Sequence, residues 1–432
     1  MSKVHFYRET KFKKTEIGEI PEGWEVRKLG EYIKDFVRGV SYKQSDIKLE
    51  PGKNFIPLLR ATNLKENKLE LRDLIFIPTN KVRPKQYLKK EDFIITTSSG
   101  TKTLVGRVLY LKEELNKPIT IGAFLAIVRI KGIDKNFVYY IFNSQLYRRY
   151  LANIIAGTNI NNLNRKVLFE FSIPLPPLEE QKAIAKVLKD FDDLIEVIDK
   201  KIETYKRIKK KLMEIYFTRG VFEHKTFKDT EIGRIPEGWE VRFLGGEVCE
   251  INPNYKAIKG NIYKYLPMEA VSESHYKVKF YKKREWKGSG VKFSSNDVLL
   301  ARITPSAENG KTALVDFLDE NEIGTGSTEF IVFRPLKADS FFIYYLLKWE
   351  KVRNQLISQM TGTTGRQRIP NDAPFKIKIP LPPLEEQKEI AKRLKAIDDQ
   401  IENLKKQKEH LQKVKKKFMD LLLTGKLRIK IN

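Results

Sequence analysis

Few residues of this chain have the types and the spacing that catalysis requires. Residues 252–255 (NPNY) would form the NPPY motif of DNA amino-methyltransferases only if Asn254 were proline. Residues 243–247 (FLGGE) lack the last glycine of an FxGxG cofactor loop. Residues 310–312 (GKT) end like a phosphate-binding P-loop, but Pro305 stands where that loop needs its first glycine. Each pattern fails at a residue that its chemistry needs, so the sequence predicts no catalytic site of these kinds.

The sequence also has few residues that could bind a metal or act as a nucleophile. The single cysteine, Cys249, excludes an internal disulfide and any zinc site built from two cysteines. The four histidines are scattered along the chain: His5, His224, His275 and His410. A nuclease site assembled from Asp297, Glu308 and Lys311 has no convincing spacing. We therefore expect no metal, no cofactor and no catalytic residue in this chain.

Polar and basic clusters suited to binding nucleic acid are more frequent. Arg and Lys contact phosphates, Asn and Gln pair with adenine, and Arg pairs with guanine. In the first half of the chain the candidate DNA-binding residues are Lys81, Arg83, Lys85, Gln86, Tyr87, Ser98, Ser99, Thr101, Lys102, Thr158, Asn159, Asn161, Asn162 and Arg165. In the second half they are Lys282, Lys283, Arg284, Lys287, Arg302, Lys311, Thr363, Thr364, Arg366, Gln367 and Arg368. The alternative for each cluster is a solvated loop shaped by glycine.

The elements that must position these residues occur twice. Residues 15–27 read TEIGEIPEGWEVR and residues 230–242 read TEIGRIPEGWEVR. Residues 173–182 and residues 379–388 both read IPLPPLEEQK. The segments between these anchors match more weakly. We therefore expect two copies of one unit, with a shared frame and different middles, as a protein needs if it does the same job on two targets.

Each copy begins with a globular part. Residues 15–177 are rich in Gly, Pro, aromatic residues and short β-branched runs, which predicts mixed α and β structure with a helix at 137–155. Examples of the expected strands are residues 93–97, 104–109 and 124–130.

Each copy ends with a long helix. Acidic residues follow Pro177 in what would be the first helical turn, and neither Gly nor Pro occurs again until Gly220. The predicted helices are 178–217 and 384–423, each about 60 Å long at 1.5 Å per residue.

A heptad pattern predicts that the two helices form a coiled coil. Its seam residues are Ile184, Val187, Phe191, Leu194, Ile198, Tyr205, Ile208, Leu212, Ile390, Ile397, Leu404, Leu411 and Phe418. Apolar residues outside the strict seam are hypothesised to contact partner helices: Ile195, Ile401 and Leu422. A solvated amphipathic helix on one domain is the alternative.

These elements predict an α+β fold. Two mixed α/β globular domains are separated by two long antiparallel helices that form a coiled coil, with a pseudo-twofold internal repeat. The expected boundaries are 1–177 for the first domain with its N-terminal arm, 178–217 for the first spacer helix, 218–383 for the second domain, 384–423 for the second spacer helix and 424–432 for the tail. The end of the second helix should then return near the start of the first domain.

Charge favours a polyanionic partner for the globular parts. The chain has 82 Lys and Arg against 55 Asp and Glu, a formal net charge of +27. The helical segments carry only +1 and +3, whereas residues 15–177 carry +10 and residues 230–383 carry +5. Double-stranded DNA, with one charge per about 1.7 Å, is the obvious candidate. No apolar stretch reaches the roughly 20 residues that span a bilayer and no signal peptide is evident, so we expect a cytoplasmic chain without a membrane partner.

The order of these parts, the repeated IGxIPEGWE and IPLPPLEEQ motifs, and the Gly-Thr near the end of each globular part resemble the specificity (S) subunit of type I restriction–modification systems. The resemblance covers almost the whole chain. It implies that each recognition domain reads one half of a bipartite, asymmetric DNA sequence. It also implies that the helices act as a spacer and dock two methyltransferase (M) subunits.

The same resemblance implies that the chemistry belongs to partners. S-adenosylmethionine would bind to the M subunits, and ATP and Mg²⁺ would serve the partner subunits, among them the restriction/translocase (R) subunits. Two alternatives from other classes stay open: a self-contained DNA methyltransferase or nuclease with fused recognition domains, and a coiled-coil scaffold that does not bind DNA.

Overall fold

The protein is described by a computed structural model that covers residues 5–65, 68–101, 104–156, 163–363 and 365–431. The chain divides into two compact units. Unit 1 contains Met1–Glu196 and Glu409–Asn432, and unit 2 contains Val197–Lys408. The two long helices, α4 (Leu178–Arg219) and α7 (Leu384–Leu423), each contribute one end to each unit. They are therefore part of the packing of both units rather than separate from them.

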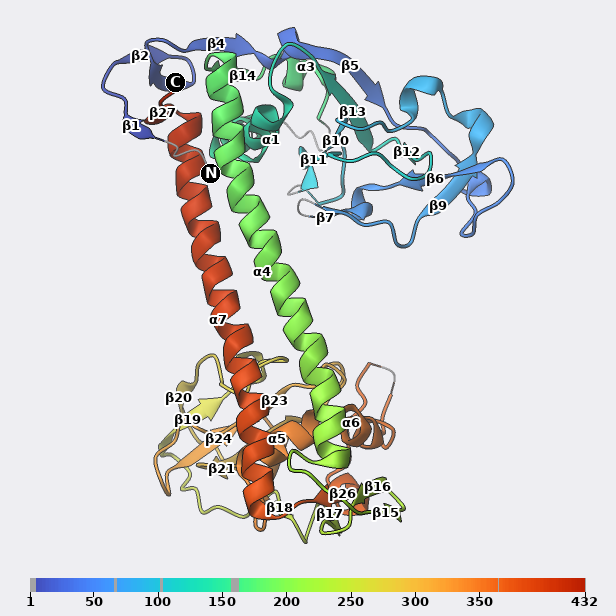
Figure 1. The fold of residues 1–432 in the computed structure, drawn as a ribbon, viewed down its shortest axis with the longest axis vertical. Coiled ribbons are helices and arrows are strands. Elements are labelled where there is room, and N and C mark those ends of the chain that lie inside the picture. Colours follow the sequence, from blue (N-terminus) through green and yellow to red (C-terminus); the bar gives the residue numbers. More distant parts are fainter. Residues whose placement is uncertain (1–4, 66–67, 102–103, 157–162, 364, 432) are drawn as a thin grey trace. The chain divides into compact units, whose positions relative to one another are not determined.

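Unit 1 contains a four-stranded antiparallel sheet and a smaller mixed sheet (Figure 1). The first has the order β11 (Val108–Tyr110), β10 (Phe93–Thr96), β13 (Leu125–Ile130) and β5 (Ile33–Arg38). The second has the order β12 (Thr120–Ile121), β6 (Phe55–Leu59) and β9 (Ile75–Pro78), with β12 parallel to β6. Two-stranded ribbons complete the unit: β2 (Phe12–Thr15) with β3 (Gly18–Pro21), β4 (Glu25–Lys28) with β14 (Ser172–Leu175), and β7 (Leu64–Lys65) with β8 (Lys68–Leu69).

Unit 2 repeats the first sheet and changes the second. Its antiparallel sheet has the order β18 (Cys249–Ile251), β25 (Phe330–Pro335), β22 (Val298–Ala301) and β23 (Thr312–Leu314). Its second sheet has four strands, β20 (Lys282–Glu285), β19 (Ile262–Leu266), β24 (Ile323–Gly326) and β21 (Val291–Ser294). The ribbons β15 (Phe227–Thr230) with β16 (Gly233–Pro236) and β17 (Glu240–Phe243) with β26 (Lys378–Leu381) match those of unit 1. The shared frame and different middles are thus visible in the strand orders.

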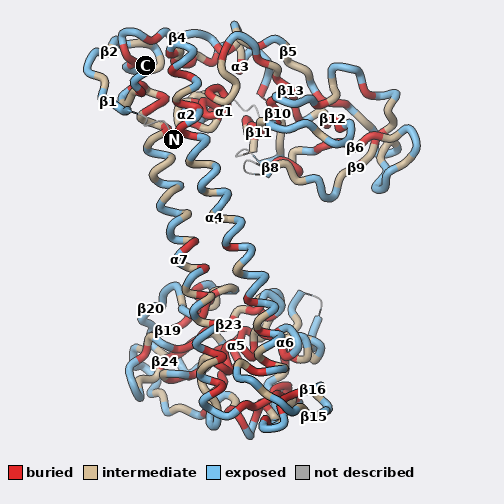
Figure 2. Tube along the Cα trace, viewed as in Figure 1, coloured by how far each residue is buried: buried red, intermediate tan, exposed pale blue. Residues whose placement is uncertain are grey.

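Short helices pack on the first sheet of each unit and fill its core. In unit 1 these are α1 (Lys135–Asn143), α2 (Gln145–Ala156) and α3 (Arg165–Phe169), and in unit 2 they are α5 (Ser340–Lys348) and α6 (Glu350–Ile357). Residues 137–142 are at most 6% exposed and residues 342–347 are completely buried, and Figure 2 shows this burial along α5. The single helix expected at 137–155 is wrong. Ser144 accepts a hydrogen bond from the Tyr147 amide and ends α1, so α2 starts anew.

The chain ends return to one another in unit 1. Strand β27 (Leu427–Ile429) pairs antiparallel with β1 (Phe6–Arg8), as the antiparallel helix arrangement predicts. The Arg428 guanidinium binds the carboxylates of Glu9 and Glu180 at 2.7–2.9 Å. The C-terminal strand therefore closes unit 1.

The two repeated motifs meet in each unit. The indole nitrogen of Trp24, in the first PEGW motif, donates to Glu180 Oε2 at 3.1 Å, in the first turn of α4. The indole nitrogen of Trp239 donates to Glu386 Oε2 at 2.8 Å, in the first turn of α7. Both tryptophans and both glutamates are buried. Each hydrogen bond therefore connects the PEGW motif of a unit to the first turn of a long helix.

The helices pair through a seam whose register differs in part from the expected one. In unit 2, Ile202, Ile401 and Leu404 are buried against Ile198, Tyr205 and Ile397. The remaining predicted positions pack in the main cores or are half-buried: Ile184, Val187, Phe191, Leu212, Ile390, Leu411 and Phe418.

Leu194 and Ile208 were wrongly assigned to the seam. Leu194 is 54% exposed and Ile208 is 40% exposed, whereas Ile195 is half-buried, and Ile401 and Leu422 are buried. Apolar residues stand at both 194 and 195, so spacing alone allowed either register, and a one-residue shift turns a side chain by about 100°. Two of the residues hypothesised to face partner helices, Ile401 and Leu422, therefore pack in the chain's own hydrophobic clusters.

A polar triad occurs at the same place in both units, buried in unit 2 and half-buried in unit 1. In unit 2, Lys209 Nζ contacts the Asp398 carboxylate oxygens at 2.6 and 2.7 Å, and the Tyr345 hydroxyl donates to Asp398 at 2.9 Å. In unit 1, Lys415 pairs with Asp192, and the Tyr140 hydroxyl donates to the same carboxylate at 2.8 Å. Each triad joins α4, α7 and the first short helix of its unit.

We predict that Asp398→Ala lowers the free energy of unfolding by about 3–5 kcal/mol, because it leaves the Lys209 ammonium buried without its counter-ion. The measurement is a urea titration. The matched control is Glu350→Ala, which removes the carboxylate of the exposed Lys210–Glu350 pair and should cost less than about 1 kcal/mol. Equal losses in the two variants would contradict this role.

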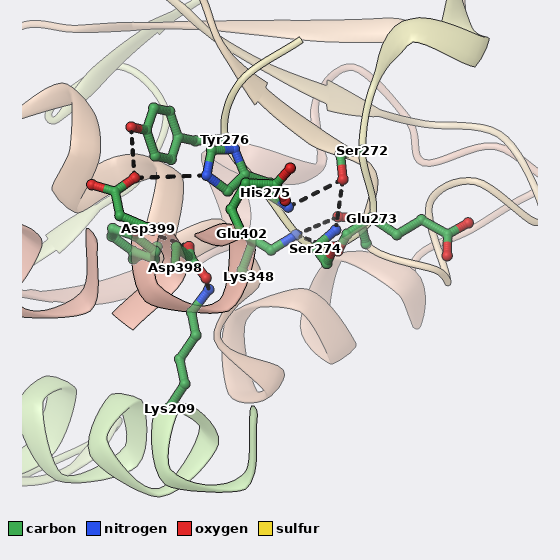
Figure 3. Close-up of polar contacts among 12 residues, drawn as sticks. Lys209, Ser272, Glu273, Ser274, His275, Tyr276, Lys348, Asp398, Asp399 and Glu402 are labelled. Atoms are coloured by element: carbon green, nitrogen blue, oxygen red, sulfur yellow. Dashed lines mark hydrogen bonds and ion pairs between the residues drawn. The ribbon is translucent and has the colours of Figure 1, made fainter. Parts of the chain in front are cut away.

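The triad of unit 2 continues into a larger cluster (Figure 3). Lys348 Nζ donates to the carbonyl oxygens of Glu273 and Gly310, both at 2.9 Å. Burial, together with the positive charge of Lys209, lowers the pKa of Lys348 to about 7. On the other side of the cluster, Asp399 accepts from the Tyr276 hydroxyl at 3.1 Å. The cluster therefore holds a lysine that folding favours in its neutral form.

This lysine predicts a pH dependence of stability. The unfolded side chain titrates near 10.5, so between pH 7 and about 10 the unfolded chain binds more protons than the folded chain. The contribution of Lys348 to the free energy of unfolding should therefore rise with pH from 7 to about 9. Lys348→Met should reduce that rise in urea titrations at pH 7 and pH 9, and the exposed Lys351→Met should not. An unchanged slope in Lys348→Met would contradict the assignment.

Candidate nucleic-acid interface

Three backbone segments meet at the same corner of each unit. In unit 1 the amide of Thr97 donates to Phe124 O at 2.8 Å, and the amide of Leu163 donates to Thr97 O at 2.6 Å. In unit 2 the amide of Arg302 donates to Glu329 O at 2.9 Å, and the amide of Ile369 donates to Arg302 O at 2.8 Å. We call this arrangement the corner. It joins the loop after β10 or β22, the turn before β13 or β25, and the segment after the short helices.

The corner brings together clusters that are separate in the sequence. In unit 1 the polar loop with Ser98, Ser99 and Thr101 meets the segment that leads to Arg165. Both serines are half-buried, Thr101 is exposed, and its amide donates to Ser99 Oγ at 3.1 Å. The Arg165 guanidinium lies over the Phe169 ring at 4.4 Å. Candidates outside the described residues are Lys102, Thr158, Asn159, Asn161, Asn162 and Thr364.

In unit 2 the corner carries charge. Arg368 binds both carboxylate oxygens of Glu329, with Nε at 2.9 Å and Nη2 at 2.8 Å, and this carboxylate raises the pKa of Arg368. Arg302 Nη1 donates to Asn371 Oδ1 at 2.6 Å, and burial lowers the pKa of Arg302. The sequence predicts both arginines as binding residues. It does not predict Glu329, which binds Arg368, or Asn371, which accepts from Arg302.

The other candidates of this region differ in where they point. Thr363 and Arg366 form an exposed turn, with the Arg366 amide donating to Thr363 O at 2.9 Å. The carbonyl of Gln367 accepts from the Thr304 amide at 3.0 Å, and the Gln367 side chain is half-buried. Lys311 Nζ donates to Met268 O at 3.3 Å, so its ammonium serves the fold of unit 2.

The basic loop at residues 81–87 is largely engaged within unit 1. Lys81 pairs with Asp46 at 2.6 Å and Lys85 pairs with Asp35 at 3.0 Å. Gln86 donates to Arg38 O at 3.0 Å and accepts from the Arg83 amide at 2.9 Å, and Tyr87 packs half-buried on the second sheet. The guanidinium of Arg83 is exposed. This loop therefore offers less free positive charge than its sequence suggests.

The basic run of unit 2 lies on an edge strand. Lys282, Lys283 and Arg284 belong to β20, which is exposed along its whole length, and Lys287 follows it. Lys282 pairs with Glu269 at 3.1 Å, and the Arg284 guanidinium lies 4.8 Å from the Tyr265 ring centroid. Arg284 and Lys287 also line a polar cavity of about 210 Å³ beside residues 325–328. Glu329 of the corner follows residues 325–328, which line this cavity, directly in the chain.

The motifs rejected as catalytic have structural roles. Asn252 Oδ1 accepts from the Val332 amide at 2.9 Å, and the Tyr255 hydroxyl donates to Asp297 at 2.7 Å. Cys249 is buried, and burial raises the pKa of its thiol. Over the described part of the chain, no group of three or more His, Cys, Asp or Glu residues is arranged to hold a metal. No described helix is long and apolar enough to cross a membrane.

Comparison with known proteins identifies the class. Residues 21–207 and 236–413 match the family described as type I restriction modification DNA specificity domain. The two matches fall on the two copies of the repeat, and the chain belongs to this family.

Similar proteins from Methanocaldococcus jannaschii extend over the full length. The putative type I restriction enzyme MjaX specificity subunit is 35% identical, over 99% of both chains. The type I restriction enzyme MjaVIII specificity subunit is 34% identical, over 99% of this chain and 98% of that protein. A solved structure from work on complex assembly and conformational transition of the type I restriction–modification system shares the fold, with a TM-score of 0.56 at 17% identity over 94% of this chain and 99% of the other.

The exposed edge strand gives a prediction for this class of protein. If Arg284 and Lys287 contact phosphates, replacing either by Ala should weaken binding to every duplex about equally. Each variant should also flatten the slope of log K against log salt by about 0.9 per lost contact. The measurement is fluorescence anisotropy on duplex DNA over a salt series. Lys406→Ala, which removes an exposed charge from α7, should leave the slope unchanged. A slope that is also unchanged in both β20-region variants would remove them from the interface.

Proposed function

We propose that this chain is the non-catalytic specificity subunit of a type I restriction–modification system and recognises a bipartite, asymmetric double-stranded DNA sequence. Each unit reads one half-site. The observation that carries this proposal is the corner, because the same three backbone segments present Thr97 and Phe124 in unit 1 but Arg302 and Glu329 in unit 2. Equivalent frames with different side chains suit the reading of two different base sequences.

The charge distribution supports DNA as the ligand of both units. The globular segments carry most of the excess positive charge, and the long helices carry little. The candidate DNA-binding residues of the corner and of β20 are the part of this excess that we assign to the interface.

We propose that the exposed apolar residues of α4 dock partner subunits. Within unit 2, Val197, Ile208 and Ile215 are 40–48% exposed and lie on one side of the helix. On this proposal two methyltransferase subunits bind the helices, bring S-adenosylmethionine and methylate adenine, while restriction/translocase subunits use ATP and Mg²⁺. The helices also act as the spacer between half-sites.

The test of the proposal is a map of methylated adenines in DNA exposed to the chain with its M subunits. The wild-type complex should methylate a single bipartite sequence. Exchanging residues 15–177 for those of a relative with another specificity should change one half-site and leave the other intact. A change in both half-sites, or in neither, would contradict one half-site per unit.

A second test separates this function from its alternatives. The purified chain, incubated with S-adenosylmethionine and mixed DNA, should transfer no methyl group, whereas a self-contained methyltransferase would. DNA affinity that falls steeply with salt is expected here, and its absence would favour a scaffold that does not bind DNA.

A further inference from the structure

The Arg368–Glu329 pair leaves one edge of a guanidinium free. Glu329 takes the Nε and Nη2 hydrogens along one side, at 2.8–3.1 Å. Arginine has five N–H donors in a planar fork, so the outer hydrogens of Nη1 and Nη2 remain along the opposite edge. Among the described residues, the one hydrogen bond of Nη1 is a long contact, 3.4 Å, to Arg366 O. The Arg368 side chain is 44% exposed, so this edge can reach a ligand.

The backbone fixes the position of this guanidinium. Arg368 and Thr361 exchange two main-chain hydrogen bonds, at 2.8 and 3.0 Å. The next residue, Ile369, is 1% exposed and its amide is bonded to Arg302 O. A side chain held by a carboxylate on a fixed backbone loses little freedom on binding, which is what selective recognition needs.

Two guanidinium groups and one carboxylate interact in this corner. Arg302 and Arg368 share the neighbourhood of one carboxylate, that of Glu329. Among the described residues, the buried Nε of Arg302 has no hydrogen-bond partner. A ligand that brings acceptor atoms and negative potential would therefore complement this corner. The major-groove edge of guanine, with its O6 and N7 acceptors, does both.

We propose that Arg368, held by Glu329, reads a guanine in the half-site of unit 2, donating from its free Nη1/Nη2 edge to guanine O6 and N7. This inference rests on the proposed DNA-recognition function and adds one base to it. Arg368 is the specificity-determining residue, and Glu329 is a positioning residue.

Within the part of unit 1 that the structure describes, the equivalent corner offers no such pair. Phe124, 65% exposed, stands where unit 2 has Glu329, and Thr97 stands where it has Arg302. An aromatic side chain cannot hold a guanidinium by two hydrogen bonds. The guanine contact is therefore specific to unit 2, and its loss should leave the half-site of unit 1 untouched.

The test is selection of binding sites from random duplexes by the full chain with its M subunits. Arg368→Lys keeps the charge but loses the bidentate fork, so the preference for guanine at one position of one half-site should fall about 10- to 100-fold. Glu329→Gln should weaken the same preference by a smaller factor, since one amide oxygen replaces two carboxylate oxygens. Arg242→Lys, in the exposed Arg242–Glu240 pair of the same unit, should preserve the whole consensus.

The outcomes distinguish failure of the guanine assignment from failure of the proposed DNA-recognition function. A wild-type complex that selects no sequence would end the proposed function itself. A wild-type bipartite consensus that persists in Arg368→Lys and Glu329→Gln, with binding weakened uniformly, would show a phosphate contact and overturn the guanine assignment. If Arg368→Lys fails to fold, as thermal unfolding would show, the near-isosteric Glu329→Gln decides alone.

Discussion

The hydrogen bond between a buried indole and the first turn of a long helix is the contact on which each unit depends. Trp24 with Glu180 and Trp239 with Glu386 join the PEGW turn to the helix start, although the partners are far apart in sequence. A buried carboxylate needs every available donor. Glu180 also accepts hydrogen bonds from Arg428. Glu386 also contacts His224 and accepts from the amides of Val221 and Phe222, which follow α4. The two strongest sequence repeats are therefore two halves of one contact.

Apart from this contact, the two units share several structural features and differ in others. The first sheet keeps its strand order, the first short helix is capped by an aspartate in both units, and the Tyr–Asp–Lys triad recurs. The second sheet gains a strand in unit 2, and the corner changes its side chains. The second sheet and the corner thus vary between the units, while the Trp–Glu bond, the aspartate cap and the triad are the same in both. This division explains how one scaffold can serve two recognition tasks.

Much of the fold follows from the sequence, and the misses have physical causes. Duplication, the helix starts after Pro177 and Pro383, and the return of the C-terminus could be predicted from motifs and helix-breaking residues. The seam register could not, because apolar residues occupy adjacent positions such as 194 and 195, and because Lys209 is buried whereas the predicted seam residue Ile208 is exposed. At the corner, Arg302 and Arg368 were selected by type, but Glu329 is paired with them only through tertiary contacts. Phe124 had no polar signal to mark it. The basic loop at residues 81–87 was overvalued because its acidic partners lie elsewhere in the chain.

We propose that the two units read DNA independently through equivalent surfaces. The most direct measurement is binding-site selection by a chain in which residues 15–177 replace residues 230–383, so that both positions carry the first recognition segment. We expect a symmetric target made of two inverted copies of the half-site of unit 1. A target that stays asymmetric, or that retains the half-site of unit 2, would contradict it.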